Sequence, residues 1–128
     1  MRSQLHHLAL GAQDVASLAD FYRDAVGLVE VARNLEPDGA ALRSVWFDLG
    51  GGGILMIEKA EEAPRPVIGG HGAGLFLLAV TADEETVEKR CKALESMGIR
   101  QERSTEFTRY FRDPEGNRFA FSVYSLDE

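Results

Sequence analysis

Cysteine is almost absent from this chain, and so are long apolar runs. The single cysteine, Cys91, cannot form a disulfide within the chain, which fits a reducing compartment. No apolar run approaches the roughly 20 residues that a membrane-spanning helix needs. Residues 1–5 contain no apolar core of the kind that secretory leaders carry. These absences predict a cytoplasmic protein that does not enter the membrane.

Positive charge is also scarce. The chain has 14 Lys and Arg residues against 21 Asp and Glu residues, a formal net charge of −7. Nucleic acids and anionic membranes attract clustered basic residues, so neither is expected as a partner. The glycines between residues 69 and 74 precede a predicted strand instead of following one, so they do not form a dinucleotide-binding loop. The chain has three histidines, and none is spaced from a serine and an aspartate in a pattern that indicates a Ser-His-Asp catalytic triad.

The first half of the chain reads as a strand, a helix and three more strands. Residues 5–12 form a short apolar run between polar residues, which predicts the first strand. Asp14 is well suited to begin a helix, and Gly27 stands where a helix commonly ends. Further strands are predicted over 28–34, 43–49 and 54–58. The apolar residues that recur at helical spacing are Val15, Leu18, Phe21, Tyr22 and Val26.

The same order restarts after a stretch rich in proline and glycine. Strands are predicted over 75–81, 99–103, 108–112 and 118–124, with a helix that Asp83 begins and Gly98 ends. The predicted buried stripe of this helix is Val87, Cys91, Leu94 and Met97, which gives Cys91 a structural role. We therefore predict one domain over residues 1–128, with module one at 1–60, a linker at 61–73 and module two at 74–128.

An internal repeat supports this division. Residues 44–58 align without a gap with residues 108–122, so that Ser44 matches Thr108 and Trp46 matches Tyr110. Each half is a βαβββ module with a partly apolar second sheet face that must be covered. The predicted fold class is α+β, with two βαβββ modules whose sheets form a half-open barrel around a cavity.

Two segments resemble the glyoxalase/bleomycin resistance/dioxygenase superfamily, also called vicinal oxygen chelate proteins. The first runs from His7 to Leu28, and the second covers residues 110–119 with the sequence Asp-Pro-Glu-Gly-Asn at its centre. The resemblance implies paired modules, a homodimer, and in many members a divalent metal that chelates adjacent substrate oxygens. Those members include isomerases, epimerases, extradiol dioxygenases and fosfomycin-modifying transferases, whereas others bind bleomycin-like drugs without metal or chemistry.

The resemblance places metal ligands at three positions, and only one of them holds a donor here. These positions are His7, Leu75 and Ala120, and Met56 matches Ala120 in module one. Leucine and alanine have no side-chain lone pair to donate, so the usual two-histidine, one-carboxylate site cannot form. The sequence therefore predicts no metal cofactor.

Three other residues leave alternatives open. Glu58 is two residues from Met56 on the same strand face, so His7, Glu58 and His71 form a conceivable displaced metal site. Without a metal, His7 and Glu58 are candidates for acid and base, with Tyr110 as a third catalytic candidate. The structural alternatives are a buried, hydrogen-bonded imidazole for His7, a surface charge for Glu58 and a solvated loop residue for His71. His6 is expected to point away from His7.

Strand parity predicts the side chains that line the cavity. The set is mostly apolar with a few polar groups, which is typical of a small-molecule site. Its members are His7, Ser44, Trp46, Met56, Glu58, Leu75, Thr108, Tyr110, Ala120 and Ser122. By the resemblance, Thr108 and Tyr110 match a substrate-touching Ser-x-Tyr pair of the fosfomycin enzymes. An inward Glu58 would favour a cation near Trp46 and Tyr110.

The leading hypothesis is a metal-independent protein that binds a small-molecule ligand. The alternative is a lyase, isomerase or dioxygenase that uses His7 and Glu58. A third is a regulatory subunit whose cavity has no ligand.

Overall fold

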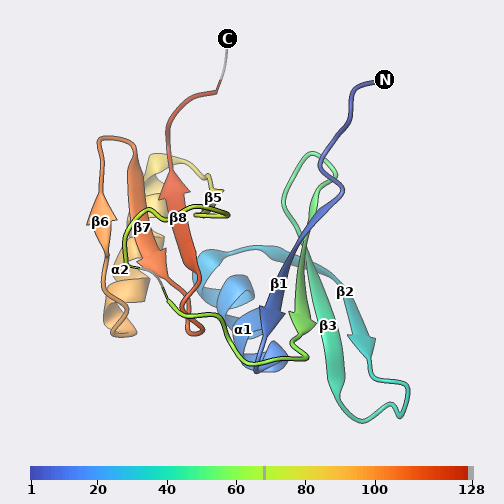
Figure 1. Cartoon of the computed structure of the whole chain (residues 1–128). Coiled ribbons are helices and arrows are strands. Elements are labelled where there is room, and N and C mark those ends of the chain that lie inside the picture. Colours follow the sequence, from blue (N-terminus) through green and yellow to red (C-terminus); the bar gives the residue numbers. More distant parts are fainter. Residues whose placement is uncertain (68, 127–128) are drawn as a thin grey trace. The chain divides into compact units, whose positions relative to one another are not determined.

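The computed structural model describes residues 1–67 and 69–126, and it divides into two units, Met1–Arg65 and Pro66–Glu128 (Figure 1). Each unit has one four-stranded sheet. The strand order is β1-β4-β3-β2 in the first unit and β5-β8-β7-β6 in the second. The two orders are equivalent, with one parallel pair followed by two antiparallel pairs. The α+β class and the two βαβββ modules are thereby confirmed, and the half-open barrel stays a prediction.

The first unit contains β1 (His7–Ala12), α1 (Val15–Phe21), the π-helical turn η1 (Tyr22–Val26), β2 (Val29–Leu35), β3 (Leu42–Asp48) and β4 (Ile54–Lys59). Asp14 begins α1, because its Oδ1 accepts a hydrogen bond from the Ser17 amide at 3.0 Å. Gly27 ends the helical segment at φ 90°, a conformation that glycine adopts without strain. The helix packs on β3 and β4. The core side chains at 0% exposure are Ala12, Leu18, Ala19, Tyr22, Val45, Phe47, Leu55 and Ile57.

The second unit contains β5 (Leu78–Val80), α2 (Glu84–Ser96), β6 (Arg103–Ser104), β7 (Thr108–Arg112) and β8 (Arg118–Ser122). Asp83 begins α2 by accepting a hydrogen bond from the Thr86 amide at 2.7 Å. Its core contains Val87, Leu94, Phe111, Phe119 and Phe121.

The register of the two central hairpins repeats residue for residue. Phe47 pairs with Leu55 in the β3–β4 hairpin, and Phe111 pairs with Phe119 in the β7–β8 hairpin. These are the pairs that the ungapped alignment of 44–58 with 108–122 predicts. The internal repeat is therefore a repeat of structure as well as of sequence.

The Asp-Pro-Glu-Gly-Asn turn joins β7 to β8 through one buried carboxylate. Asp113 is 5% exposed and accepts hydrogen bonds from the amides of Glu115 and Asn117 at 2.8 and 3.0 Å. The Asn117 side chain donates a third bond at 2.9 Å. Gly116 adopts φ 88°, which favours glycine. This turn fixes the hairpin register and hence which side chains share a face.

Several predicted boundaries are wrong. The strand predicted over 75–81 comprises only Leu78–Val80, and the one predicted over 99–103 begins at Arg103. Met97 is 57% exposed and lies outside the buried stripe, because it follows the last helical residue. The predicted linker 61–73 contains no helix or strand among its described residues.

Among the described residues, no helix has the length and apolar character needed to cross a bilayer. The predicted homodimer stays a prediction. The edge strand β2 has exposed apolar side chains that association would cover. They are Val29, Val31 and Leu35, which are between 51% and 66% exposed.

Candidate ligand-binding faces

The face of the first sheet opposite α1 collects the predicted site residues of module one. We call it the first helix-free face, and the strand register defines it. Trp46 pairs with Met56 and Ser44 with Glu58 across β3 and β4. His7 reaches the same face from β1, where it pairs with Ile54. Because paired residues in a sheet point to the same side, five predicted residues share this face. They are His7, Ser44, Trp46, Met56 and Glu58.

Trp46 carries an unmet hydrogen-bond donor on this face. Its Nε1 is buried and has no partner among the described residues. Beside it, Asn34 on β2 donates to the Ser44 hydroxyl at 3.0 Å, so that hydroxyl is held in place. A buried donor without an acceptor costs about 1–3 kcal/mol. An acceptor atom supplied by a ligand would remove that cost.

His7 and Glu58 share a face but lie far apart along it. The register pairs His7 with Ile54, and Glu58 follows four residues later on β4. At about 3.3 Å per residue, the separation is about 13 Å. Two side chains that far apart cannot transfer protons at one bond or bind one metal ion. The predicted acid–base pair and the displaced metal site are therefore not supported.

The two adjacent histidines also differ from the prediction. His6 precedes the first residue of β1, and its Nδ1 lies 2.9 Å from Nδ1 of His7. The predicted opposite orientation of the two rings fails because His6 is not part of the regular strand. Both residues are exposed, so the alternative of a buried His7 imidazole is wrong as well.

The second sheet has an equivalent helix-free face, which we call the second helix-free face. Thr108 pairs with Ser122 and Tyr110 with Ala120, so these four predicted residues point to one side. The Thr108 hydroxyl donates to the Ser122 hydroxyl at 2.9 Å. Ala120 is fully buried, so its small side chain is part of the packed surface of the sheet.

An ion network that the sequence did not predict lies on the same face. Glu102 accepts hydrogen bonds from Arg112 Nε at 2.6 Å and from Arg118 Nε at 2.8 Å. Arg118 also donates to the Gly69 carbonyl at 3.0 Å. Partial burial alone would raise the pKa of Glu102, but the bonds from Arg112 and Arg118 outweigh it and hold that pKa below its ordinary value.

Phe76 takes the place that was predicted for Leu75. Leu75 is 78% exposed and precedes the short strand β5, so strand parity does not assign it to this face. The Arg118 guanidinium carbon lies 4.2 Å from the centre of the Phe76 ring. His71 stacks on the same ring, with centroids 3.8 Å apart. His71 is exposed and lies outside the helices and strands, as expected of a solvated loop residue, and it has an aromatic contact within its own unit.

The donor set does not fit the divalent metal that the superfamily resemblance implies. Of the three positions, only His7 has a side chain that can coordinate a metal. Leu75 is an exposed leucine and Ala120 a buried alanine. Across residues 1–67 and 69–126, no three His, Cys, Asp or Glu side chains group as metal ligands. No chemical step through a metal is derived for this chain.

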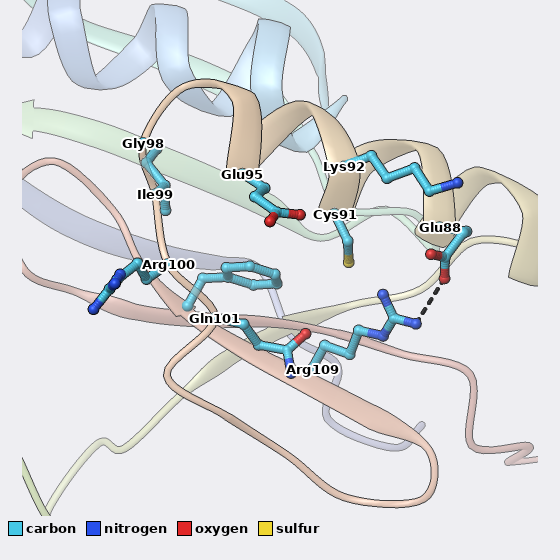
Figure 2. Close-up of a pocket in the computed structure, with 10 residues that line it drawn as sticks. Glu88, Cys91, Lys92, Glu95, Gly98, Ile99, Arg100, Gln101 and Arg109 are labelled. Atoms are coloured by element: carbon cyan, nitrogen blue, oxygen red, sulfur yellow. Dashed lines mark hydrogen bonds and ion pairs between the residues drawn. The ribbon is translucent and has the colours of Figure 1, made fainter.

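A separate cavity of about 580 Å³ lies between α2 and the second sheet, on the side of the sheet opposite its helix-free face (Figure 2). Its side chains include Cys91 and Arg109, and Arg109 binds Glu88 at 2.6 Å. Tyr22 in the first unit and Cys91 in the second both lie eight residues after the aspartate that begins the helix, and both side chains are buried.

Burial raises the pKa of the Cys91 thiol, and the hydrogen bond and positive charge of Arg109 offset only part of that rise. The thiol is therefore protonated near neutral pH. Because the thiolate is the reactive form, the cavity has no activated nucleophile.

Parity could have found some of the residues that the prediction missed. Arg112 lies two residues after Tyr110 on β7, and Arg118 lies two residues before Ala120 on β8. The strand period of two therefore assigns both arginines to the second helix-free face. Phe76 and Glu102 lie outside the strands. No periodic signal in the sequence identifies them.

Comparisons with known proteins identify a family model that matches this chain and solved structures that are similar to it. The sequence model described as the Glyoxalase/Bleomycin resistance protein/Dioxygenase superfamily matches residues 4–121. A glyoxalase/dioxygenase from Nostoc punctiforme is similar in structure, with a TM-score of 0.74 at 20% identity, covering 92% of this chain and 88% of that one. A lactoylglutathione lyase from Agrobacterium tumefaciens has a TM-score of 0.64 at 27% identity, with coverage of 94% and 93%.

A fosfomycin resistance protein, FosX, from Listeria monocytogenes has a TM-score of 0.74 at 18% identity, with coverage of 98% and 96%. That protein was solved with Mn(II) and a dihydroxypropylphosphonic acid. No curated protein matches the chain in sequence.

Proposed function

Because the chain belongs to the glyoxalase/bleomycin resistance protein/dioxygenase superfamily, we propose that it binds a small organic molecule on its helix-free faces without using a metal ion. The observation that carries the proposal is the buried Nε1 of Trp46, which has no acceptor among the described residues. A ligand with an acceptor atom satisfies this donor and covers the indole ring.

The neighbours of Trp46 support binding over simple core packing. Met56 lies directly across from it and offers an adaptable apolar contact. Ser44 and Glu58 form the next pair along the hairpin and supply polar groups. A mostly apolar surface with a few polar groups is the usual composition of a small-molecule site. The opposite face of the same sheet, by contrast, is entirely apolar at Val45, Phe47, Leu55 and Ile57.

Catalysis by His7 and Glu58 together is the weaker proposal. Their separation of about 13 Å along β4 prevents a shared role at one bond. Relatives named as lyases and resistance enzymes keep the catalytic class open for the family. For this chain, binding alone accounts for the residues present.

The first experiment uses the dye anilinonaphthalene sulfonate as a probe. Its emission reports binding, and Trp46 is the only tryptophan, so quenching of its fluorescence reports contact with the first helix-free face. We expect saturable binding near one dye per chain with quenching of Trp46. Trp46→Phe keeps the apolar ring and removes the N–H, and it should weaken binding about fivefold to tenfold.

Tyr124→Phe is the control, because Tyr124 is 59% exposed and its hydroxyl is no part of either face as defined. It should leave dye affinity unchanged. Absence of saturable binding, or equal affinity of the wild type and Trp46→Phe, would refute the proposal for this face.

Metal independence is tested by elemental analysis of untagged protein purified without chelators, and again after incubation with Mn, Ni, Zn and Fe(II). We expect far less than one metal per chain. Near-stoichiometric metal that disappears in His7→Ala would overturn this part of the proposal and favour a metal-dependent enzyme.

A further inference from the structure

Arg103 on the second helix-free face is a cation without an anionic partner in the part of the chain that the structure describes. Among the described residues, no carboxylate lies within ion-pair distance of its guanidinium. Its contact on this face is with Tyr110, whose ring centre lies 4.9 Å from the guanidinium carbon. The two residues are also directly paired between β6 and β7. The ring holds the side chain in place but supplies no carboxylate, so N–H donors of Arg103 remain available.

Two further arginines lie on the same face as Arg103. Arg112 and Arg118 point to the same side, as their pairing in register with Tyr110 and Ala120 requires. Both bind the single carboxylate of Glu102. Arg103 thus carries a positive charge that no carboxylate of the described residues pairs with, in a chain whose formal net charge is −7. Local positive charge in an acidic protein attracts anions to that place.

A cationic ligand does not fit this face. An aromatic ring can bind a cation over its face, but here Arg103 already makes that contact with Tyr110 and Arg118 makes it with Phe76. The sequence favoured a cation near Trp46 and Tyr110, and at Tyr110 the chain's own Arg103 occupies that position.

We infer that the ligand of the second helix-free face is a small organic acid, whose carboxylate or phosphonate group binds Arg103. This inference rests on the proposed binding function and names its ligand class. Guanidinium groups bind such anions through parallel N–H···O bonds, which are stronger than neutral hydrogen bonds. Thr108 and Ser122, hydrogen-bonded to each other two residues along the strand pair from Tyr110, offer further hydroxyl contacts for the acid.

The test compares three probes of similar shape and different charge: phenylacetate, 2-phenylethanol and phenethylamine. Amide chemical shifts of the nitrogen-15-labelled full chain locate each probe. We expect only phenylacetate to shift the amides of β6 and β7, with an affinity that falls as salt is added. Arg103→Ala should weaken its binding about tenfold, and Arg103→Lys should restore part of it. The matched control is Arg100→Ala, which removes the same charge from the opposite side of the sheet, where Arg100 lines the α2 cavity.

The outcomes separate the two proposals. If 2-phenylethanol or phenethylamine shifts the second helix-free face as strongly as phenylacetate, the acid class is wrong while binding at the face stands. If Arg103→Ala and Arg100→Ala weaken phenylacetate equally, Arg103 is not the anion-binding residue. If no probe shifts either helix-free face and the dye also fails to bind, both the acid class and the binding function are refuted.

Discussion

Arg118 donates a hydrogen bond from Nε to Oε1 of Glu102 at 2.8 Å, although its side chain is only 5% exposed. A guanidinium that is removed from water needs a compensating charge, so removing that charge is costly. Glu102→Gln keeps the shape and one acceptor oxygen but loses the charge. We expect it to lower the free energy of unfolding by about 1–3 kcal/mol in urea denaturation.

The matched control for this change is Glu88→Gln, which also neutralises a glutamate paired with an arginine. Glu88 and Arg109 are 48% and 37% exposed, so water screens their interaction. The cost should not exceed about 1 kcal/mol. Equal losses for the two variants would show that burial of Arg118 does not strengthen its pairing with Glu102.

The same carboxylate should make stability depend on acid pH. The pKa of Glu102 is held below its ordinary value of 4.5 in the folded chain. A group with a depressed folded pKa stabilises the protein above its unfolded pKa, and this contribution is lost as pH falls through the folded value. The difference in unfolding free energy between wild type and Glu102→Gln should therefore be constant between about pH 6 and 8. It should shrink below about pH 4.5, and a difference that grows with acid would contradict the assignment.

Local patterns predicted the parts of the fold that depend on period and turn chemistry. Asp14 and Asp83 begin their helices as expected, because an aspartate at that position binds a free backbone amide. The pairing of Phe111 with Phe119 follows from the repeat and the turn between them. The same strand period assigned nine of the ten predicted site residues to helix-free faces.

Leu75 is the exception, and its failure has a physical cause. Gly74 adopts φ 106°, which interrupts the extended chain just before Leu75. Strand β5 begins only at Leu78, so residues 75–77 are not extended in the sheet and parity counted back from Ala79 does not apply to Leu75. Phe76 contacts Arg118 instead. Contacts of this kind depend on tertiary packing of an irregular segment. No periodic pattern in the sequence encodes them.

Ala120 stands where the superfamily resemblance places a carboxylate, and its burial predicts that the second sheet does not tolerate one there. Its side chain is fully buried, whereas Ala79, which pairs with it from β5, is exposed. Ala120→Glu should lower the free energy of unfolding by about 2–3 kcal/mol, because a carboxylate would be buried. Ala79→Glu, on the same face, should cost less than about 0.5 kcal/mol.

Thermal unfolding with and without Mn(II) extends this comparison. Since Leu75 offers no donor, Mn(II) should not recover the stability that Ala120→Glu loses. Recovery in that variant, but not in Ala79→Glu, would show that metal ligands are present at positions where this sequence predicts none.

The Cys91 thiol should react slowly in the native protein. It is 8% exposed, and burial raises its pKa, so little thiolate is present near neutral pH. Labelling with a disulfide reagent should be slow at about pH 7, accelerate as pH rises, and become fast in urea. Arg109→Gln removes the positive charge that partly offsets the rise, so it should slow native labelling further at any given pH.

The control separates thiolate chemistry from access to the cavity. Lys92→Gln removes a positive charge from the same cavity lining without altering the bond between Arg109 and Cys91. If Arg109 acts through its direct contact, Lys92→Gln should leave the labelling rate nearly unchanged. Faster labelling in Arg109→Gln would mean that the arginine blocks entry to the cavity more than it stabilises thiolate. Rapid stoichiometric labelling of the wild type at neutral pH would contradict the buried, protonated state of the thiol.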